Sequence, residues 1–553
     1  MTLKTSMTMT MSKPCFGYLS FVVLLLAVLT LSVTEAADSA IHDTFLKCLA
    51  EKTKMASGEL SKIVFAQNNP SFTTVLNDLA RNERYRTAKT PKPVLVVTPL
   101  EELQVQGTVI CAKTAKLQIR TRSGGHDYEG VSYVSKEPFI IVDMFNLRAV
   151  TVDVKNEVAV VQAGATLGEV YYRIWEKSKA HGYPAGVCPT VGAGGHISGA
   201  GYGNMVRKYG MTVDNLIDAK IVDAKGNLLD KKSMGEDLFW AIKGGGGGSF
   251  GVIVSFTIKL VPVPEKVTVF RVEKTMETKV TATDLLVQWQ QVAPTTDHRL
   301  FMRVLLQLAN SEVQKGKMTG QASIVAMFLG GADEVVSILG KEFPLLGLKK
   351  ENCTEVSWIE SVMWWNNDKS LENGDKPETL LDRNLNSSSF MKRKSDFVEK
   401  AIPKEGLETM FETMIELKTI GLVFNPYGGK MDEISSDATP FPRRKGTLFK
   451  VQYSVSWDDP SPATAQENTD GAKKLHSVMT PYMSSNPRGA YLNYRDLDIG
   501  VNNFGPNSFE EGKVYGTKFF GKNFDRLVDV KTKVDPENFF RNEQSIPVRA
   551  SKA

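Results

Sequence analysis

Apolar and polar residues alternate through the first half of the chain in a pattern that predicts short strands separated by helices. The β-rich segments PVLVVTP and LQIRTRS flank a helix that begins in TPLEEL, with Thr98 as its cap, Pro99 as its first residue and Glu101 as the capping-box partner. FIIVDM, AVTVDV and EVAVVQAG predict further strands of alternating polarity. This order indicates a domain of both helices and strands.

The same patterns continue up to a proline-rich segment that ends near residue 262. TLGEVYYRIWEKS predicts a helix capped by Thr166 and Glu169, LIDAKIVDAKGNLLD predicts a β-hairpin, and VIVSFTIKLVPVP predicts a closing strand. We therefore expect a first domain over 38–262.

The composition changes after this proline-rich segment. Longer amphipathic stretches such as TATDLLVQWQQVA alternate with strands such as SIVAMFLG and TLFKVQYSVSW, which predicts a second α/β domain over 263–485. The last segment, 486–553, is rich in Tyr, Asn and Asp and is expected to return to the first domain.

The N-terminus has the three parts of a secretory signal peptide. Lysines precede the apolar run FGYLSFVVLLLAVLTLSV, and small residues follow it in TEAADSA. We expect residues 1–37 to be removed by cleavage near Ala36 or Ala37. An uncleaved membrane anchor is the alternative, because the run approaches spanning length. No second run of that length follows, so integral membrane association is not expected.

Charge and glycosylation signals fit a secreted protein. Lys plus Arg number 67 and Asp plus Glu 62, which gives a formal net charge of +5 without a long basic run. A nucleic-acid partner is therefore not expected. Asn352-Cys353-Thr354 and Asn386-Ser387-Ser388 are sequons, so Asn352 and Asn386 are candidate glycosylation sites.

Removal of the signal peptide takes Cys15 and leaves Cys48, Cys111, Cys188 and Cys353. Cys48 and Cys111 lie on apolar helical patterns and could join the N-terminus to the next helix. Cys188 and Cys353 do not resemble packed core thiols. The sequence has no CxxC pair and no metal-spaced set of Cys and His, so no metal site is predicted.

Two glycine-rich stretches each hold one reactive side chain. His126 lies in RSGGHDYEG (122–130), and Cys188 lies in GVCPTVGAGGH (186–196). Glycine lets the backbone approach a bulky flat molecule and adopt positive φ. Each side chain alone would more often be structural, but together they predict two covalent tethers for one planar cofactor.

Two further glycine segments add weaker evidence. KGGGGGSFGVIVSF has a nominal GxGxxG at Gly246, Gly248 and Gly251, but a strand follows where a dinucleotide-binding fold requires a helix. Its backbone amides could cradle a phosphate, and a simple tight turn is the alternative. His196, in GAGGHISGAGYGNMVRKYG, is either a hydrogen-bond donor to a ring carbonyl or a buried structural histidine.

Eight segments resemble the plant berberine bridge enzyme-like family: RSGGHDYEG, GVCPTVGAGGH, GYGNMVRKYG, MGEDLFWAIKGGGGGSFGVI, NPYGGKM, PFPRRKG, YLNYRDLDIG and KVDPENFFRNEQSIP. The resemblance covers essentially the whole mature chain. It implies an α+β fold, with an FAD-binding domain of the vanillyl-alcohol-oxidase type plus an α/β substrate domain with an antiparallel sheet. It also implies a secreted FAD-linked oxidase.

The resemblance implies roles for the residues of the glycine loops. His126 would bond the flavin 8α-methyl and Cys188 would bond C6, and two bonds should raise the reduction potential. His196 would stabilise negative charge at the flavin N1–C2 edge. The family's disulfide would join Cys48 to Cys111. The other expected cofactor-binding residues are Gly124, Gly125, Val191 and Gly192.

Two positions bear on the reaction type. Val191 lies three residues after Cys188, where valine resembles the family's oxidases and leucine its dehydrogenases, because the larger side chain blocks oxygen. We therefore predict hydrogen peroxide as a product, with simple packing of Val191 as the alternative. Gln452 stands where the alkaloid-cyclising member that names the family has a glutamate, and glutamine cannot take up a proton usefully. Alkaloid bridge formation is therefore not expected.

Five residues match family members that oxidise alcohols such as monolignols: Tyr128, Tyr202, Lys450, Gln452 and Tyr494. By this resemblance Lys450 lowers the pKa of Tyr202, whose phenolate takes the alcohol proton while hydride passes to flavin N5. Tyr128 and Tyr494 would orient the substrate. Lys450 and Gln452 share one face of a predicted strand, which would ordinarily be solvated. Glu433 is a further acidic candidate that we expect at the surface.

Three hypotheses about function follow. The first is a secreted oxidase of CH–OH groups in a phenylpropenyl alcohol or a carbohydrate, located in the extracellular space or cell wall. The second is oxidation of a carbon beside nitrogen in a specialised metabolite. The third is a non-catalytic cell-wall flavoprotein, which the flavin motifs and the Tyr/Lys set argue against. A small-molecule or oligosaccharide substrate and molecular oxygen are the expected partners, and cell-wall polysaccharide is left open.

Overall fold

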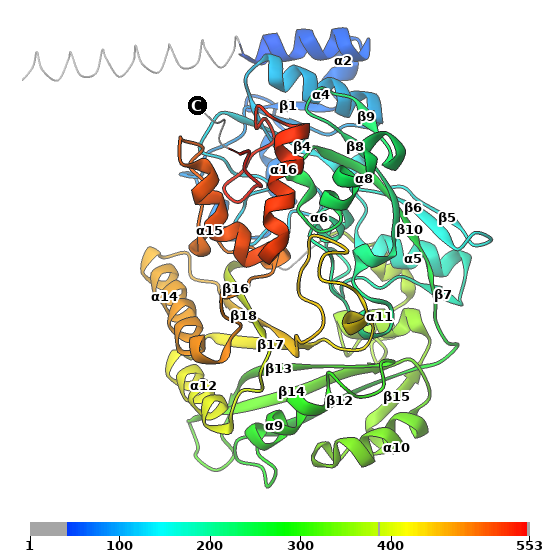
Figure 1. The fold of residues 1–553 in the computed structure, drawn as a ribbon, viewed down its shortest axis with the longest axis vertical. Helices are drawn as coiled ribbons and strands as arrows, with labels where there is room; N and C mark the ends of the chain where they lie inside the picture. Colours follow the sequence, from blue (N-terminus) through cyan, green and yellow to red (C-terminus); the bar gives the residue numbers. More distant parts are fainter. Residues whose placement is uncertain (1–40, 385–387, 550–553) are drawn as a thin grey trace, which may run out of the picture.

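The computed structural model describes residues 41–384 and 388–549 (Figure 1). The predicted signal peptide and the candidate glycosylation site Asn386 lie outside these residues. Among the described residues, a four-stranded and a five-stranded sheet occupy the upper part of Figure 1, a seven-stranded sheet occupies the lower part, and two short strands form a fourth sheet. Within the described ranges, none of the helices combines the length and the apolar character that a membrane span needs.

The first sheet contains four strands in the order β1 (Val64–Ala66), β2 (Leu95–Val97), β4 (Phe139–Asp143) and β3 (Gln118–Arg122). β2, β4 and β3 are parallel, and α4 (Glu102–Thr114) makes the crossover that a parallel arrangement requires. Cys111 on α4 forms a disulfide with Cys48 on the helix over 41–53, with the Cα atoms 5.6 Å apart. This disulfide confirms the pairing that the family resemblance implies.

The predicted start of α4 is wrong. The backbone N–H of Thr98 donates to the carbonyl of Ile63 at 2.8 Å and so extends the pairing of β2 with β1. Because this bond keeps Thr98 in the sheet, Glu101 becomes the N-cap and the helix begins at Glu102.

The second sheet is antiparallel, with the order β5 (Val150–Asp153), β6 (Val158–Gln162), β10 (Val252–Lys259), β8 (Leu216–Val222) and β9 (Leu228–Leu229). The predicted hairpin is β8–β9, and the predicted strand after the glycine run is β10. The capping box of α5 (Leu167–Lys177) is also confirmed, because Thr166 Oγ1 accepts from the Glu169 N–H at 3.3 Å and Glu169 Oε2 accepts from the Thr166 N–H at 2.8 Å.

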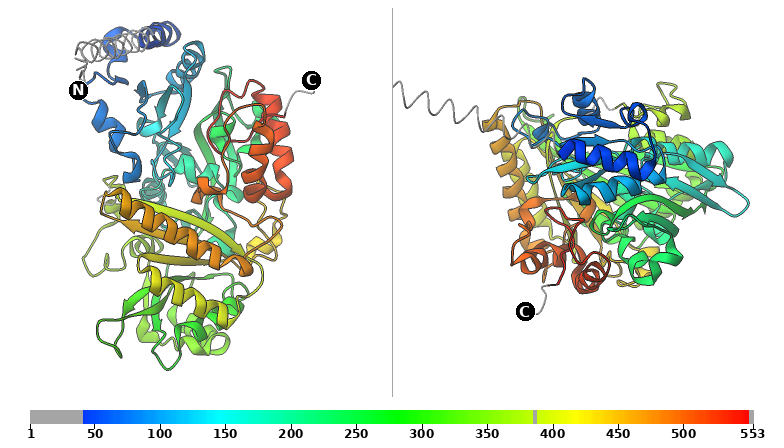
Figure 2. Two further views of the ribbon diagram at one scale, coloured as in Figure 1. Left: turned by 90° about the vertical axis from the view of Figure 1, so that its left-hand side faces the viewer. Right: turned by 90° about the horizontal axis from the view of Figure 1, so that it is seen from above.

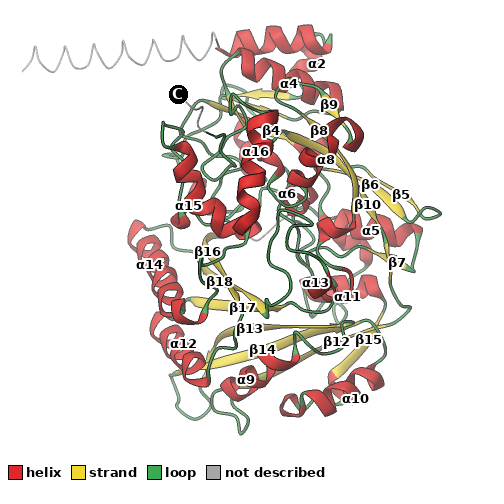
Figure 3. Ribbon diagram, in the orientation of Figure 1, coloured by secondary structure: helices red, strands yellow, loops and turns green. Residues whose placement is uncertain are grey.

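The third sheet has seven antiparallel strands, in the order β15 (Cys353–Val356), β12 (Val267–Thr275), β14 (Met318–Phe328), β13 (Leu300–Asn310), β17 (Ile420–Pro426), β18 (Phe449–Trp457) and β16 (Phe390–Val398). The helices α9 (Ala282–Val292), α12 (Lys404–Leu417) and α14 (Pro462–Val478) run along this sheet (Figures 2 and 3). One strand face packs with Leu285 and Trp289 of α9 in a core that includes Phe449 and Val451. Side chains at the intervening positions, such as Phe301, therefore face the first two sheets.

The end of the chain packs against the glycine segment and the first sheet. Lys531, on α16 (Phe524–Val534), donates to the carbonyl of Ser249 at 2.7 Å and pairs with Asp535 at 2.6 Å. Arg120 on β3 pairs with Glu543 at 2.8 Å. The helices α15 (Ser508–Phe520) and α16 accordingly lie beside the upper sheets in Figure 1.

The other described helices and strands are α2 (Ser57–Leu60), α3 (Phe72–Asn77), β7 (His181–Gly182), α6 (Ala193–Ser198), α7 (Val206–Tyr209), α8 (Lys231–Ile242), β11 (Val261–Pro262), α10 (Ala332–Glu342), α11 (Trp358–Asn366) and α13 (Lys430–Glu433).

Candidate functional site

The two glycine-rich loops that carry His126 and Cys188 are in close backbone contact. A Cβ at Gly124 would lie 2.4 Å from the backbone nitrogen of Gly192, and a Cβ at Gly192 would lie 2.1 Å from Ser123 Oγ. Gly125 has a φ of +66°, and a Cβ there would lie 1.5 Å from the carbonyl oxygen of Leu79. Side chains are therefore excluded where the loops meet, which brings their backbones into contact.

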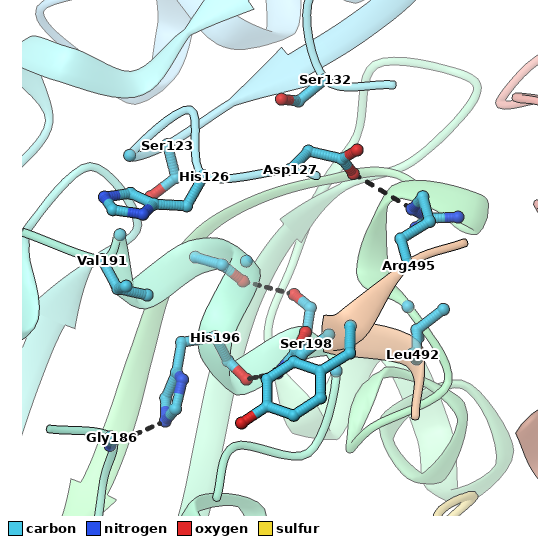
Figure 4. Close-up of a pocket in the computed structure, with 18 of the residues that line it drawn as sticks. Ser123, His126, Asp127, Ser132, Gly186, Val191, His196, Ser198, Leu492 and Arg495 are labelled. Atoms are coloured by element: carbon cyan, nitrogen blue, oxygen red, sulfur yellow. Dashed lines mark hydrogen bonds and ion pairs between the residues drawn. The ribbon is translucent and has the colours of Figure 1, made fainter. Parts of the chain in front are cut away.

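A cavity of about 400 Å³ lies between these loops and the third sheet, and Figure 4 shows the part of its wall that holds His126, Val191 and His196. Its walls include most of the predicted site: Gly124, Gly125, His126, Tyr128, Cys188, Val191, Gly192, His196, Tyr202, Gln452 and Tyr494. Glycines of the 243–256 segment, Gly246, Gly247, Gly248 and Gly251, line it as well. The structure thus gathers three glycine motifs around one space.

The two predicted tethers face this cavity from separate loops. Cys188 is a free thiol whose surface is exposed to the cavity, although protein encloses it on its other sides. His126 Nε2 lies 3.3 Å from Thr190 Oγ1. Burial and the positive charge of Arg81 lower the pKa of His126 to about 3, so the ring is neutral and keeps a free lone pair. Both reactive side chains therefore border the same cavity.

The donors around the cavity fit FAD. Among the described residues, buried N–H groups of Arg120 and Arg495 and the hydroxyl of Ser132 line the cavity without a hydrogen-bond partner. Arg495 also pairs with Asp127 at 3.0 Å. A diphosphate offers oxygens to such donors and to glycine backbone amides, while the glycine walls leave room for a flat ring. These residues would hold the dinucleotide.

His196, on the short helix α6, is held as a neutral ring. Its Nε2 accepts from the Gly186 N–H at 3.1 Å and lies 3.2 Å from Thr212 Oγ1, whose hydroxyl donates to the Pro184 carbonyl at 2.8 Å. Burial, and then Lys450, lower the pKa of His196 to about 3. With Nε2 accepting, the proton resides on Nδ1, so His196 offers an N–H donor rather than a positive charge.

Lys450 lies behind the cavity wall in a cage of aromatic rings. Its Nζ lies 3.8 Å from the ring centroid of Tyr202, 4.2 Å from that of Tyr491 and 4.3 Å from that of Tyr494. The side chain is fully buried, and Nζ has no hydrogen-bond partner among the described residues. The alternative of a solvated strand face is therefore wrong for Lys450, because the first two sheets cover that face. Burial lowers the pKa of Lys450 well below its ordinary value of 10.5.

Tyr202 stacks on Tyr427 with the ring centroids 5.3 Å apart, and its hydroxyl donates to the carbonyl of Pro426. Burial, and then the neighbouring Tyr427, raise the pKa of Tyr202 well above its ordinary value. The hydroxyl is therefore protonated when the site is at rest, and any role as a base depends on a nearby positive charge.

The remaining predicted residues form one polar edge of the cavity. Gln452 Nε2 donates to the hydroxyl of Tyr128 at 2.9 Å, and the rings of Tyr128 and Tyr494 lie 6.0 Å apart. Because Gln452 is engaged as a donor and cannot accept a proton, this edge offers polar contacts to the cavity but no base.

Sequence patterns did not single out several residues of the cavity wall, among them Phe301, Arg303, Asn425 and Tyr491. Arg303 lies over the ring of Trp365 at 4.6 Å, and its Nε has no partner among the described residues, as is also true of Asn425 Nδ2. Two sequence features could have indicated two of them. Arg303 is a charged residue within a strand of mostly apolar residues, and Tyr491 is a second tyrosine in YLNYRD.

Three other predicted positions lie outside the cavity. Asn352 is exposed, with its Oδ1 accepting from the Lys349 N–H at 3.0 Å, and Cys353 is a half-buried free thiol. Glu433 is exposed and pairs with Lys430 at 2.7 Å, which agrees with the surface position expected for it.

Comparison with known proteins identifies the class. The family described as FAD binding domain matches residues 93–231, and the family described as berberine and berberine like matches residues 490–547. Berberine bridge enzyme-like 21 of Arabidopsis thaliana is 57% identical over 522 residues, which cover 94% of this chain and 96% of that protein.

Solved structures agree with this result. Berberine bridge enzyme from Eschscholzia californica matches with a TM-score of 0.85 and 37% identity, over 92% of this chain and all of that chain. Wild-type Phl p 4.0202, described as a glucose dehydrogenase, matches with a TM-score of 0.84 and 40% identity, over 91% of this chain and 99% of that chain. An isoleucine-to-valine variant of Phl p 4 is described as a glucose oxidase.

The fold, the cavity and these matches define an FAD-linked oxidoreductase with the α+β architecture that the sequence predicts. The chain belongs to the berberine bridge enzyme-like family.

Proposed function

We propose that the protein oxidises a CH–OH group of a monolignol-like alcohol or a carbohydrate, with FAD bonded to His126 and Cys188, and passes the electrons to O2 to form H2O2. Bound FAD supplies the acceptor for the hydride. The observation that carries the proposal is the buried amine of Lys450, which has no hydrogen-bond partner among the described residues and is enclosed by the rings of Tyr202, Tyr491 and Tyr494 beside the cavity.

Tyr202 is the proposed base, with Lys450 as its partner. Neither group favours its charged form alone, because burial raises the pKa of Tyr202 and lowers that of Lys450. A phenolate and an ammonium formed together stabilise each other, since opposite charges attract strongly away from bulk water. Tyr202 would exchange its bond to the Pro426 carbonyl for the substrate hydroxyl.

The polar edge of the cavity favours alcohol oxidation over the second hypothesis. Tyr128 and Tyr494 would orient the substrate, and Gln452 holds Tyr128 instead of acting as a base. The neighbour named as a glucose dehydrogenase supports a carbohydrate substrate. The berberine bridge enzyme neighbour supports oxidation beside nitrogen, which we keep as the second candidate.

Val191 supports oxygen as the electron acceptor. It lines the cavity near His126 (Figure 4). The Phl p 4 variants described as glucose oxidases carry an isoleucine-to-valine change, and one of them adds an asparagine-to-histidine change five residues later. In this chain Val191 and His196 are also five residues apart, so they match in type and spacing the valine and histidine that these changes introduce.

We also propose that the protein acts outside the cell, in the cell wall or extracellular space. The support is the N-terminal signal pattern, the disulfide between Cys48 and Cys111, and the exposed sequon at Asn352.

The test is anaerobic bleaching of the flavin in the purified protein with three probes: coniferyl alcohol, a cello-oligosaccharide and a benzylisoquinoline amine. Fast bleaching by the alcohol or the sugar is expected. Bleaching by the amine alone would reject CH–OH oxidation in favour of the second candidate.

A further inference from the structure

Thr190 connects the two loops that carry the proposed tethers. It lies two residues after Cys188, is 9% exposed, and places its Oγ1 3.3 Å from Nε2 of His126 in the other loop. Its carbonyl oxygen also lies 3.1 Å from the position of a Cβ at Gly124, where the loop backbones meet. The hydroxyl of Thr190 is thus a direct polar contact between the cysteine loop and the histidine ring.

A hydroxyl suits this position because Nε2 of the ring changes from a hydrogen-bond donor to an acceptor when Nδ1 forms a bond. Neutral imidazole carries one N–H and one lone pair, and Thr190 Oγ1 can accept from an Nε2–H, which leaves the lone pair on Nδ1. After Nδ1 forms a bond, Nε2 has lost its proton and becomes an acceptor. The same hydroxyl can then rotate and donate to it, because a threonine hydroxyl both donates and accepts.

We propose that Thr190 is a positioning residue for covalent attachment at His126, where its hydroxyl fixes the ring orientation and keeps Nδ1 as the nitrogen that forms the bond. The inference rests on the proposed attachment of FAD to His126 and Cys188. It concerns the formation of one bond and not the oxidation of substrate.

The attachment step balances with oxygen as the oxidant. A C–N bond forms to the 8α carbon while one C–H bond of that methyl group and the Nε2–H bond break. The electron pair of the C–H bond and the two protons pass to the isoalloxazine, and O2 then takes them as H2O2. Thr190 neither gains nor loses a proton overall. Its hydroxyl therefore positions the ring and does not act as an acid or a base in the step.

The test compares Thr190→Val, which keeps the side-chain shape without the hydroxyl, with Thr190→Ser, which keeps the hydroxyl. Full-length secreted protein is digested with trypsin, and mass spectrometry gives the flavin-bearing fraction of peptide 123–136, which contains His126, and of peptide 180–207, which contains Cys188. Samples are taken over time after synthesis.

Histidyl attachment is expected to be about tenfold slower in Thr190→Val, the factor for loss of one ordinary hydrogen bond. Attachment to Cys188 should stay near the wild-type level, and Thr190→Ser should restore the histidyl bond. Wild-type rates at both peptides in Thr190→Val would overturn the inference. Equal loss at both peptides, or loss of the histidyl bond in Thr190→Ser, would also overturn it, since the loop as a whole would then be responsible.

The wild-type digest separates this inference from the proposal beneath it. If peptide 123–136 of the wild type carries no flavin, the proposed attachment itself is wrong. If it does carry flavin and Thr190→Val matches it, only the role of Thr190 is wrong.

Discussion

Lys450 lies in an environment that disfavours its charged form. Its amine is fully buried, lies over three tyrosine rings, and has no hydrogen-bond partner in the described ranges. A buried polar group without a partner costs about 1–3 kcal/mol of stability. Contacts of the amine with the three ring faces offset part of this cost, and the proposed phenolate of Tyr202 would offset more of it.

Replacing either member of the proposed pair should slow substrate oxidation. Lys450→Met and Tyr202→Phe are each expected to lower the anaerobic rate constant of flavin reduction by an alcohol about 10²–10⁴-fold, the usual contribution of a positioned acid or base. Stopped-flow absorbance measures this rate. Tyr427→Phe is the matched control, because it removes a hydroxyl without a partner in the described chain from the ring stacked on Tyr202. A near wild-type rate in Tyr202→Phe would remove Tyr202 from the mechanism.

The same lysine should make stability depend on pH. Its pKa is lowered well below 10.5 in the folded state, so the unfolded state binds more protons between the two values and stability rises with pH across that window. Lys450→Met should therefore unfold at a higher urea concentration than the wild type at neutral pH. The difference should shrink as the pH approaches 10.5. A difference that is independent of pH would contradict a lowered pKa of Lys450 in the folded state.

Val191 should control the reaction with oxygen. Val191→Leu is expected to slow reoxidation of the reduced protein by O2 about tenfold or more, which corresponds to ~1.4 kcal/mol of barrier. Anaerobic reduction should be unchanged. Val191→Thr, which keeps the shape, should reoxidise at the wild-type rate, and unchanged reoxidation in Val191→Leu would assign Val191 to packing alone.

At the scale of elements, strand β16 holds the two sides of the site together. Lys392 Nζ pairs with Glu129 at 2.5 Å and with Asp496 at 2.7 Å, and Lys394 Nζ pairs with Asp496 at 2.6 Å and with Asp498 at 2.8 Å. Glu129 follows Tyr128, and Asp496 follows the segment that contains Tyr494. The buried charges therefore fix the segments that carry Tyr128 and Tyr494 to one strand.

This cluster predicts a loss of stability in acid. Burial opposes ionisation of Asp498, but Lys392 and Lys394 outweigh it and lower its pKa to about 2 from an ordinary 3.8. The folded state thus binds fewer protons, so the stabilisation is complete above pH 3.8 and disappears as the pH falls through 2. Urea titrations should show Asp498→Asn less stable than the wild type at pH 6 and equal to it near pH 2.

Glu433→Gln, at the exposed pair with Lys430, is the control for this titration and should leave the urea midpoint close to the wild-type value, since exposed ion pairs contribute little. A gap between Asp498→Asn and the wild type that persists at pH 2 would mean that Asp498 acts through packing and not through its charge.

Local sequence signals predicted an element well where interactions between neighbouring residues determine its geometry. The capping box at Thr166 and Glu169 and the hairpin over 216–229 depend on neighbouring residues alone, and both are present. The start of α4 was missed because the bond from Thr98 to Ile63 belongs to the sheet. The alternation in FKVQY gave the shared face of Lys450 and Gln452, but whether that face is solvated depends on the other sheets.

At the scale of the whole molecule, the cavity is assembled from distant segments. Asn493 donates to the carbonyl of His196 at 2.9 Å across a sequence separation of 297 residues. The glycine loops could be found from sequence because their composition marks them. Arg303, Asn425 and Tyr491 were missed, because only the packing of the third sheet and the C-terminal segment against the loops turns them toward the cavity.

The most direct measurement of the proposed function combines both halves of the reaction in one sample. The flavin of the wild-type protein is reduced anaerobically with one equivalent of coniferyl alcohol or a cello-oligosaccharide, oxygen is then admitted, and oxidised product and H2O2 are counted. We predict one H2O2 for each alcohol group oxidised, with rapid recovery of the flavin spectrum. Reduction followed by slow recovery without H2O2 would contradict an oxidase and would make the protein a dehydrogenase.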